Sequence, residues 1–585
     1  SKYESFEQAV QPFKTILDLW VSQHFGNDGV TQVMEVHGQD VLDALKKQDR
    51  TKLHKNERES LDQTETLSEA HHFFHWELEF PEVFIDLDVS DWKDNPGFDV
   101  VVGNPPYGKS DDKNTSTYIF NIFDFIEYRA EYYTAFMERS GEIVKKSGYI
   151  SFIVPDNWMY LDFTSRLRKY ILENRHIQSI VALPSNVFSD ATVDTSIFVQ
   201  KVPVDLKRGK KVKVIAYEKQ GSIDSVSITK GFQIEQNYWL GFHGYIINPY
   251  LFPNEAKIID KCLDGSEKLE ELTEIKYGLK AYQKGKGNPP QSRDTVTKKP
   301  YTSNIKLSND FQPFLMGESI SRYAKTSNYY INWGDWLAEP RPEELFVGPR
   351  LLFRKVAGER LIGTYLEDEA FSNTLLYVIK ADQEVESHKE KNFLKVILAI
   401  LNSRLLGFIY RKLFAIQPDD TFPQVLLDDL ASLPIVKFDL NQLNSSQSGD
   451  LSSAINNLPH LAQQMLDMHQ QKQDETSGFL SWLERFMGTS LENLSGYTII
   501  QDYYKIDGGK EELIDRLKRN NSKIPDQDIT SRNAQEKVIE EYEQSMETLE
   551  PLLNRIDKTD RLIDRIVYQL YGLTEEEIAV VERKD

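Results

Sequence analysis

The chain has 585 residues, of which 40% are hydrophobic and 27% are charged, and its formal net charge is −22. This length exceeds one ordinary hydrophobic core and predicts about three domains, and the composition excludes a disordered chain. No run of about 18 apolar residues occurs, so we expect no membrane partner. The single cysteine, Cys262, excludes an internal disulfide and a cysteine-rich zinc site, and it favours a cytoplasmic location.

Residues 1–75 are expected to form a helical segment, with the charged stretch from Glu57 to Ser68 as a polar interruption. No glycine-rich nucleotide loop follows an apolar strand in this segment. His71, His72 and His75 stand among aromatic residues, which favours a packing role for them. We predict no metal site here, because no second cluster of ligands follows at a usable spacing.

Residues 76–265 are expected to form an α/β domain, because short apolar runs alternate with helical patterns in its first part. Such alternation is typical of a parallel sheet. The expected strands cover 98–103, 149–154, 177–183 and 195–200, and the expected helices cover about 122–146 and 163–173. The part after residue 203 is richer in strand patterns and is harder to assign.

The strand at 98–103 runs directly into Asn104, Pro105, Pro106 and Tyr107. In open α/β sheets, ligands bind at the carboxyl ends of the strands, so this segment lies where a site is expected. The prolines fix the backbone and have no N–H groups, and Asn104 offers a side-chain carbonyl acceptor. Together these acceptors can take both hydrogens of an amino group.

This arrangement suits methylation of the exocyclic amine of adenine, a weak nucleophile whose lone pair is delocalised into the ring. If Asn104 and the Pro105 carbonyl take its hydrogens, the nitrogen can direct its lone pair at a sulfonium methyl group. Tyr107 would stack on the base after it is flipped from the duplex. The alternative is a proline-rich turn in which Asn104 caps its own backbone.

The segment FDVVVGNPPYG, residues 98–108, resembles the catalytic motif of the gamma-class amino-methyltransferases that modify adenine in DNA. Residues 76–84, 148–159 and 183–199 resemble further segments of large restriction-modification methyltransferases of the type IIG kind. The resemblance implies a partial Rossmann-like methyltransferase sheet, S-adenosylmethionine as methyl donor and double-stranded DNA as substrate. It also implies that Phe188 is a second base-stacking residue, although a buried packing role remains equally open.

Residues 266–440 mix short strands, aromatic residues and turns, and they resemble a TaqI-like C-terminal specificity domain. The resemblance implies an α+β target-recognition domain that reads the DNA sequence. A basic stretch near its start supplies candidate phosphate contacts, namely Lys276, Lys280, Lys284, Lys286, Arg293, Lys298 and Lys299. A solvated, lysine-rich loop is the alternative. A buried helix is expected at 393–413.

Residues 441–585 are expected to form a helical C-terminal region, with 538–570 as a long amphipathic helix. Much of the acidic excess of the chain lies here. The region is expected to be a helical bundle or an arm that binds a protein partner.

Methyltransferases of this kind bind S-adenosylmethionine through a glycine-rich loop after the first strand and an acidic residue further on. We find neither before residue 98, and Asp507-Gly508-Gly509-Lys510 follows no buried strand and indicates a turn. We therefore expect the cofactor-binding loop to lie outside this chain. The chain would then be a C-terminal fragment that is inactive alone.

The sequence thus predicts methylation of adenine N6 in DNA within a restriction-modification system. One alternative is a methyltransferase of another phage-defence system, such as BREX, without a nuclease. A second alternative is a DNA-binding or assembly module without catalysis. The intact Asn104 and Tyr107 favour catalysis, whereas the missing cofactor loop favours the second alternative for this chain alone.

Overall fold

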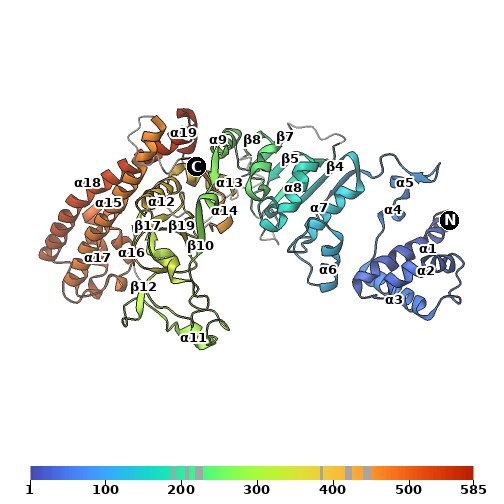
Figure 1. The fold of residues 1–585 in the computed structure, drawn as a ribbon, viewed down its shortest axis with the longest axis horizontal. Helices are drawn as coiled ribbons and strands as arrows, with labels where there is room; N and C mark the ends of the chain where they lie inside the picture. Colours follow the sequence, from blue (N-terminus) through green and yellow to red (C-terminus); the bar gives the residue numbers. More distant parts are fainter. Residues whose placement is uncertain are drawn as a thin grey trace. The chain divides into compact units, whose positions relative to one another are not determined.

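The computed structural model describes residues 2–185, 187–188, 193–203, 210–217, 228–327, 329–382, 387–414, 424–438 and 450–583. The chain divides into two compact units, residues 1–256 with 412–415 and residues 257–411 with 416–585 (Figure 1). The predicted division into four segments, with boundaries after residues 75, 265 and 440, stays a prediction.

The first unit begins with a group of helices, α1 (Lys2–Ser22), α2 (Val30–Lys46) and α3 (Lys55–His71). Leu19, Val33 and Leu61, one from each helix, are buried in their shared core. Two short helices, α4 (Trp76–Glu79) and α5 (Pro81–Phe84), and a small hairpin of β1 (Ile85–Asp86) and β2 (Asp91–Trp92) lead to the sheet.

The sequence predicted a polar interruption from Glu57 to Ser68, but this stretch lies inside α3. Its inward face carries Glu57, Ser60, Leu61 and Thr64, all buried and at helical spacing. The side chain of Asn27 donates to the Ser60 carbonyl at 2.9 Å and to Thr64 Oγ1 at 3.1 Å. The prediction was wrong because buried polar side chains satisfy one another here, so the helix lacks an apolar stripe.

The histidines after α3 pack and form hydrogen bonds within the helical group. His75 Nε2 lies 2.7 Å from Asp18 Oδ1, and the His71 ring lies 4.4 Å from the Phe25 ring. Across the described ranges, no three His, Cys, Asp or Glu side chains are grouped so that they could hold a metal ion.

A six-stranded sheet in the order β3-β4-β6-β5-β7-β8 forms the core of the first unit. Its strands are β3 (Phe98–Gly103), β4 (Val144–Pro155), β5 (His176–Ala182), β6 (Thr195–Lys201), β7 (Lys211–Tyr217) and β8 (Ile228–Glu235). The α/β class is confirmed. The sheet is mixed, however, because β6 runs antiparallel to both β4 and β5. A parallel connection needs a crossover, usually a helix, and no described helix stands between β5 and β6.

Of the helix predicted at about 122–146, the structure keeps the part that forms α7 (Tyr132–Ile143), whereas α6 (Lys113–Ile122) ends where the prediction begins and the residues from Val144 onward belong to β4. Between α6 and α7, the backbone N–H groups of Asp124 and Phe125 donate to the carboxylate of Glu138, at 2.6 and 3.2 Å. The Glu138 side chain of α7 thus binds peptide N–H groups of the preceding loop. These bonds stabilise the loop and prevent α6 and α7 from forming one continuous helix. The other predicted helix is α8 (Ser165–Asn174).

The second unit contains two four-stranded sheets, in the orders β10-β19-β16-β17 and β11-β15-β12-β18. The first is antiparallel throughout, and in the second β12 and β18 are parallel. The strands are β10 (Thr273–Tyr277), β11 (Thr302–Ser303), β12 (Phe311–Leu315), β15 (Tyr329–Asn332), β16 (Arg350–Arg354), β17 (Gly363–Leu366), β18 (Phe371–Ser372) and β19 (Leu376–Ala381). A shared hydrophobic core lies between them. The predicted α+β character is confirmed.

Smaller elements complete the two units. Two strand pairs are β9 (Ser266–Lys268) with β20 (Pro434–Val436), and β13 (Ile320–Ser321) with β14 (Ala324–Lys325). The short helices are α9 (Pro253–Leu263), α10 (Leu269–Leu272), α11 (Arg293–Lys298) and α14 (Leu427–Ala431).

The helix predicted at 393–413 is two helices, α12 (Ser387–Leu401) and α13 (Arg404–Leu413). At the break, the Asn402 side chain bonds both the N–H and the carbonyl of Gly363, at 3.0 Å each. Within the ranges described, no single helix is long and apolar enough to cross a membrane. Lys389–Leu401 and Arg404–Leu413, bent by 62°, pass that test only as a pair and only by length and composition.

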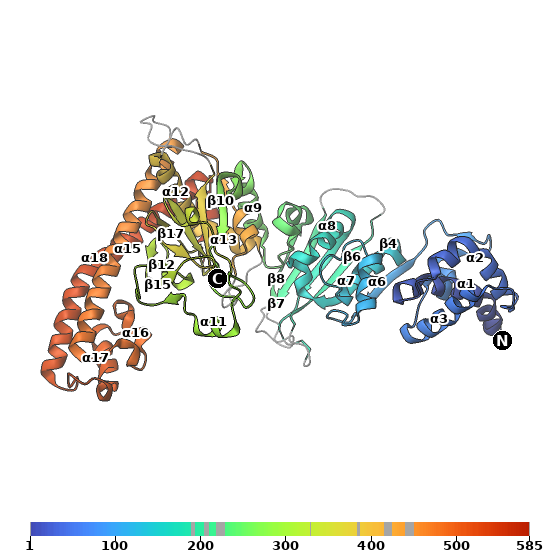
Figure 2. The same ribbon diagram turned by 60° about the horizontal axis from the view of Figure 1, so that its bottom comes forward.

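Two long helices, α15 (Asp450–Met487) and α18 (Arg532–Leu570), run side by side in the C-terminal region (Figures 1 and 2). With α16 (Tyr497–Gln501) and α17 (Gly509–Arg519) they enclose a hydrophobic cluster, and α19 (Glu575–Val581) follows them. The predicted helical C-terminal region is confirmed. Gly508, with φ +89°, stands immediately before α17, so the Asp507–Lys510 segment is a turn that starts a helix.

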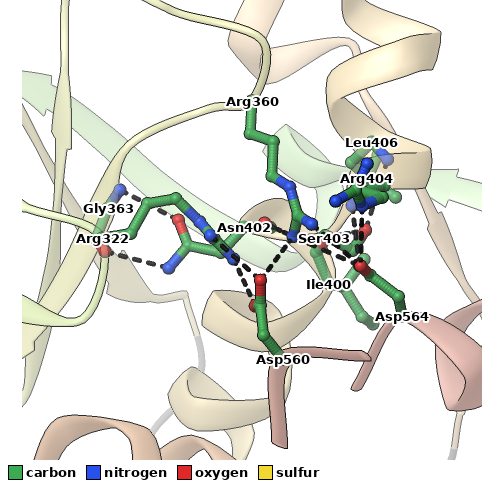
Figure 3. A network of polar contacts seen from close by, with 10 residues as sticks. All are labelled: Arg322, Arg360, Gly363, Ile400, Asn402, Ser403, Arg404, Leu406, Asp560 and Asp564. Carbon is green, nitrogen blue, oxygen red and sulfur yellow. Dashed lines mark hydrogen bonds and ion pairs between the residues drawn. The ribbon is translucent and has the colours of Figure 1, made fainter. Parts of the chain in front are cut away.

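A buried network of charges joins α18 to the sheets of the second unit (Figure 3). Asp560 binds Arg322 at 2.6 Å and Arg360 at 3.2 Å, and Asp564 binds Arg360 at 2.9 Å. Burial opposes the ionisation of both carboxylates. At Asp560 burial is the largest single effect, but the charges of Arg322, Arg360 and Arg404 and the hydrogen bond from Arg322 together lower the pKa. At Asp564 burial prevails and raises the pKa. The network therefore holds the helical region against the sheets through fixed, directional contacts.

Candidate active site and candidate nucleic-acid interface

The segment from Asn104 to Tyr107 lies at the carboxyl end of β3, as predicted. β3 pairs in parallel with β4, with Gly103 opposite Phe152, so both strands deliver their carboxyl ends to one edge of the sheet. β3 is the first strand in the sheet order, and no strand in the described ranges pairs with its other side. Val100 and Val102 are 55% and 75% exposed on this strand.

The loop after Tyr107 is fixed to the residues that precede α7. The Tyr132 N–H donates to the Gly108 carbonyl at 2.9 Å, and the Ser110 N–H donates to the Ala130 carbonyl at 3.2 Å. Gly108 has φ +87°, a left-handed conformation that favours glycine, and it turns the chain toward these partners. The segment from 104 to 107 is therefore anchored at both ends, by β3 and by these bonds.

Asn104 and Pro106 are exposed, whereas Pro105 is buried. The side-chain amide of Asn104 has no hydrogen-bond partner among the residues described. The structure thus gives no support to the alternative in which Asn104 caps its own turn. The amide is accessible to a ligand at the edge of the sheet.

The structure brings together the two residues predicted to stack on a base. The ring centroids of Tyr107 and Phe188 lie 6.4 Å apart, with an angle of 75° between the ring planes. The Tyr107 hydroxyl donates to the Ile153 carbonyl of β4 at 3.3 Å, and burial raises the pKa of this hydroxyl. Both residues are half-buried, so neither is enclosed in the core.

The sequence reasoning missed polar residues at the carboxyl end of β4. Tyr133 donates to Asn157 Oδ1 at 2.8 Å, and Tyr160 donates to Asp156 Oδ1 at 2.9 Å. Asp156 and Tyr133 are buried, and burial raises the pKa of Tyr133. These bonds fix the edge of the sheet beside the Asn104 segment. The available signal was the position of Asp156 and Asn157 directly after an apolar strand, the same signal that identified Asn104.

The seven basic residues predicted to contact DNA divide into two groups. Three are already engaged: Lys276 with Glu274 at 3.2 Å, Lys298 with Asp294 at 3.0 Å, and Lys280 with the Gln283 side chain at 2.7 Å. The other four are exposed and form no ion pair in the part of the chain that the structure describes, and they are Lys284, Lys286, Arg293 and Lys299. These four side chains have no carboxylate that competes with a phosphate in the described part of the chain.

Three family models match the chain. Residues 8–188 match the Eco57I restriction-modification methylase, residues 312–435 match the TaqI-like C-terminal specificity domain, and residues 452–567 match a domain of unknown function. The first match includes the Asn104 segment and Phe188. The second covers most of the sheets of the second unit.

Two curated relatives are restriction enzymes joined to methyltransferases. RM.MjaORFECS2P of Methanocaldococcus jannaschii, whose function is assigned provisionally, is 27% identical to this chain over 390 residues. The alignment covers 62% of this chain and 28% of the relative. RM.Eco57I of Escherichia coli is 34% identical over 107 residues, which are 17% of this chain and 11% of the relative. The matched parts thus span 28% and 11% of the lengths of these relatives.

Among solved structures, the type IIL restriction-modification enzyme MmeI in complex with DNA has a TM-score of 0.41 and 13% identity. That alignment covers 82% of this chain and 55% of MmeI. The family matches and the curated relatives confirm the resemblance that the sequence predicted. The chain therefore combines an Eco57I-type restriction-modification methylase segment with a TaqI-like C-terminal specificity domain.

Proposed function

We propose that the chain supplies the catalytic loop and the target-reading part of a restriction-modification enzyme that methylates adenine N6 in double-stranded DNA. The observation that carries this proposal is the accessible amide of Asn104 at the carboxyl edge of the sheet, three residues before Tyr107, whose ring lies 6.4 Å from the ring of Phe188. Both relatives are named as restriction enzymes and methyltransferases, which favours a restriction-modification system over a defence system without a nuclease.

The chemistry follows from the acceptors that this segment presents. Asn104 Oδ1 and the Pro105 carbonyl accept the two hydrogens of the adenine amine, which makes the nitrogen more tetrahedral and directs its lone pair outward. S-adenosylmethionine, when bound, supplies a methyl group on a positively charged sulfur. The bond from this nitrogen to the methyl carbon would form as the carbon–sulfur bond breaks and the sulfur leaves as a neutral thioether, and Asn104 and the Pro105 carbonyl would hold the nitrogen until its extra proton leaves. No strong base is needed, so orientation and preorganised dipoles provide the rate enhancement.

We propose that the cofactor-binding part of the fold attaches to the edge of β3 that does not pair with β4. An unpaired strand edge presents backbone donors and acceptors that another strand can satisfy. The exposed Val100 and Val102 are apolar side chains of the kind that a covered central strand carries. A neighbouring strand here would end beside Asn104, which is where the methyl donor must be held. This supports the prediction that the cofactor loop lies outside this chain.

The proposal is tested by incubating the natural gene product with S-adenosylmethionine that carries a labelled methyl group and with duplex DNA. The DNA is then digested to nucleosides and analysed by mass spectrometry. We expect the label in N6-methyladenine. Label in a methylated cytosine would overturn the adenine assignment, and unlabelled DNA would overturn the proposed function. Sequencing of the methylated sites then gives the target for the experiments below.

Tyr107→Ala is expected to weaken engagement of the flipped base by about 1–3 kcal/mol, the usual contribution of stacking to one base. Tyr107→Phe should stay close to the wild type, because the hydroxyl makes one long bond, at 3.3 Å, to the Ile153 carbonyl. The measurement is the fluorescence of 2-aminopurine at the target adenine as protein is added. A signal that is the same for the alanine variant and the wild type would refute stacking on Tyr107.

Replacing Lys284 and Lys286 together with alanine is expected to flatten the salt dependence of DNA affinity. Each lost phosphate contact lowers the log–log slope by about 0.9, so the pair should lower it by about 2. Replacing Lys276 and Lys298 is the matched control, with a smaller expected change because both amines already pair with carboxylates. Equal slopes for the first double variant and the wild type would remove these two lysines from the interface.

The acidic, helical C-terminal region has no assigned role in this proposal. A protein partner for α15 and α18 stays a prediction.

A further inference from the structure

The loop that carries Lys284 and Lys286 is organised around one buried side chain, Gln291, which is 4% exposed. Its amide nitrogen donates to the carbonyls of Ala281 and Trp336, both at 2.8 Å. Its amide oxygen accepts from the Gln283 N–H at 3.0 Å. Both donors and one acceptor site of the amide are thus used to hold the ends of the loop together.

Backbone bonds close the same loop. The Gly285 N–H donates to the Gln291 carbonyl at 2.9 Å, and the Gln291 N–H donates to the Lys286 carbonyl at 2.8 Å. The Asn288 N–H donates to the Asp335 carbonyl at 2.7 Å. The loop is therefore attached to the segment before Leu337 as well as to itself.

Gly287 shows how closely the loop approaches that segment. Its φ is +89°, and a Cβ atom added there would lie 2.5 Å from the Trp336 carbonyl oxygen. No larger residue fits without moving the backbone. The backbone of residues 283–291 is thus held in one conformation by side-chain bonds, backbone bonds and a close contact.

Asn288 is an exposed residue of this rigid loop. Its side-chain amide has no hydrogen-bond partner within the ranges that the structure covers, and Pro289 and Pro290 follow it. The unpaired Lys284 and Lys286 stand on the same loop. A free amide on a fixed backbone, flanked by free cations, presents a donor and an acceptor in set directions beside two phosphate-binding groups.

We propose that Asn288 reads one adenine of the target sequence in the major groove, and that Gln291 is the positioning residue that holds it there. An asparagine amide can bond adenine N6 and N7 together, a pattern that no other base presents in that groove. The lysines would contact phosphates and set the register of the loop on the duplex. This inference rests on the proposed function, because it assigns a base contact to the target-reading part.

The test is in vitro selection of duplexes from a randomised pool by the 585-residue chain, as wild type and as Asn288→Ala, Asn288→Asp and Gln291→Ala. The wild type should enrich a defined sequence. Asn288→Ala should lose about 5- to 150-fold discrimination for adenine at one position and leave the others unchanged. Asn288→Asp should shift that position toward cytosine, whose N4 amine donates to a carboxylate.

Gln291→Ala should relax the same position as Asn288→Ala, which a merely structural role would not do. Asn493→Ala, an exposed asparagine between α15 and α16, is the matched control and should enrich the wild-type sequence. Because Asn288 is exposed, its variants should keep the wild-type melting temperature.

An unchanged selected sequence in both Asn288 variants would overturn the inference, as would a uniform loss of affinity without a change in base preference. A wild-type chain that selects no sequence would also overturn it. The methylation assay measures a different property, the transfer of a methyl group, so failure of this inference is distinguishable from failure of the proposed function.

Discussion

Asn104→Ala is expected to lower the rate of methyl transfer by about 100- to 1,000-fold, the usual effect of removing one preorganised polar contact to a reacting group. DNA affinity should hardly change, because the side chain is exposed and forms no bond that supports the fold in the described ranges. The measurements are single-turnover methylation of a target duplex and equilibrium binding to the same duplex. We therefore expect the variant to lower the rate of methyl transfer without lowering the affinity for DNA.

Two further variants sharpen this experiment. Asn104→Asp keeps an acceptor oxygen and should retain more activity than the alanine variant. Asn121→Ala, an exposed asparagine in α6 of the same unit, should methylate at the wild-type rate. Loss of DNA binding alone in Asn104→Ala, or wild-type methylation by it, would contradict the assigned role.

Asp564→Ala is expected to lower the free energy of unfolding by about 3–5 kcal/mol, the range for removing one partner of a buried charge pair. Asp564 is 2% exposed, and it accepts from Arg360 at 2.9 Å and from the Arg404 N–H at 2.8 Å. Its loss leaves Arg360, itself largely buried, with Asp560 as its remaining carboxylate partner in the network of Figure 3. Urea denaturation of wild type and variant gives the difference.

The same helix supplies a matched control. Asp557 pairs with Arg561 at 3.0 Å on the exposed surface of α18, and Asp557→Ala should change the free energy of unfolding by less than about 1 kcal/mol. Asp564→Asn, which keeps the shape of the side chain, should fall between the two. If both alanine variants destabilised the protein equally, the buried network would not be what holds α18 to the sheets.

The candidate active site could be located from the sequence because its signal is local. An apolar strand followed by Asn104 and two prolines predicts a sheet edge with fixed carbonyls, and the structure places the segment at the carboxyl end of β3, whose residues are exposed or half-buried. Phe188 was inferred from resemblance alone, and only the fold brings its ring to 6.4 Å from Tyr107. The function of these residues remains a proposal for the experiments above.

Other features could not be predicted, because they depend on which residues meet in space. The face of α3 that packs in the helical group is polar, and it can be buried because Asn27 donates hydrogen bonds to the Ser60 carbonyl and to Thr64. The role of Gln291 could not be predicted, because the sequence does not show that the amide of this glutamine in a polar loop is buried.

Local sequence was enough to predict the strands β3 to β6 of the first sheet, the Asn104 segment at a strand end, the basic stretch and the long amphipathic C-terminal helix. These features depend on side-chain periodicity and backbone restriction over a few residues. The direction of β6, the loop before α7, the division of the helix expected at 393–413, the frame around Gln291 and the charges buried by α18 emerged only in the folded chain. Each of these depends on a polar group finding its partner elsewhere in the chain, and periodicity carries no information about such pairing.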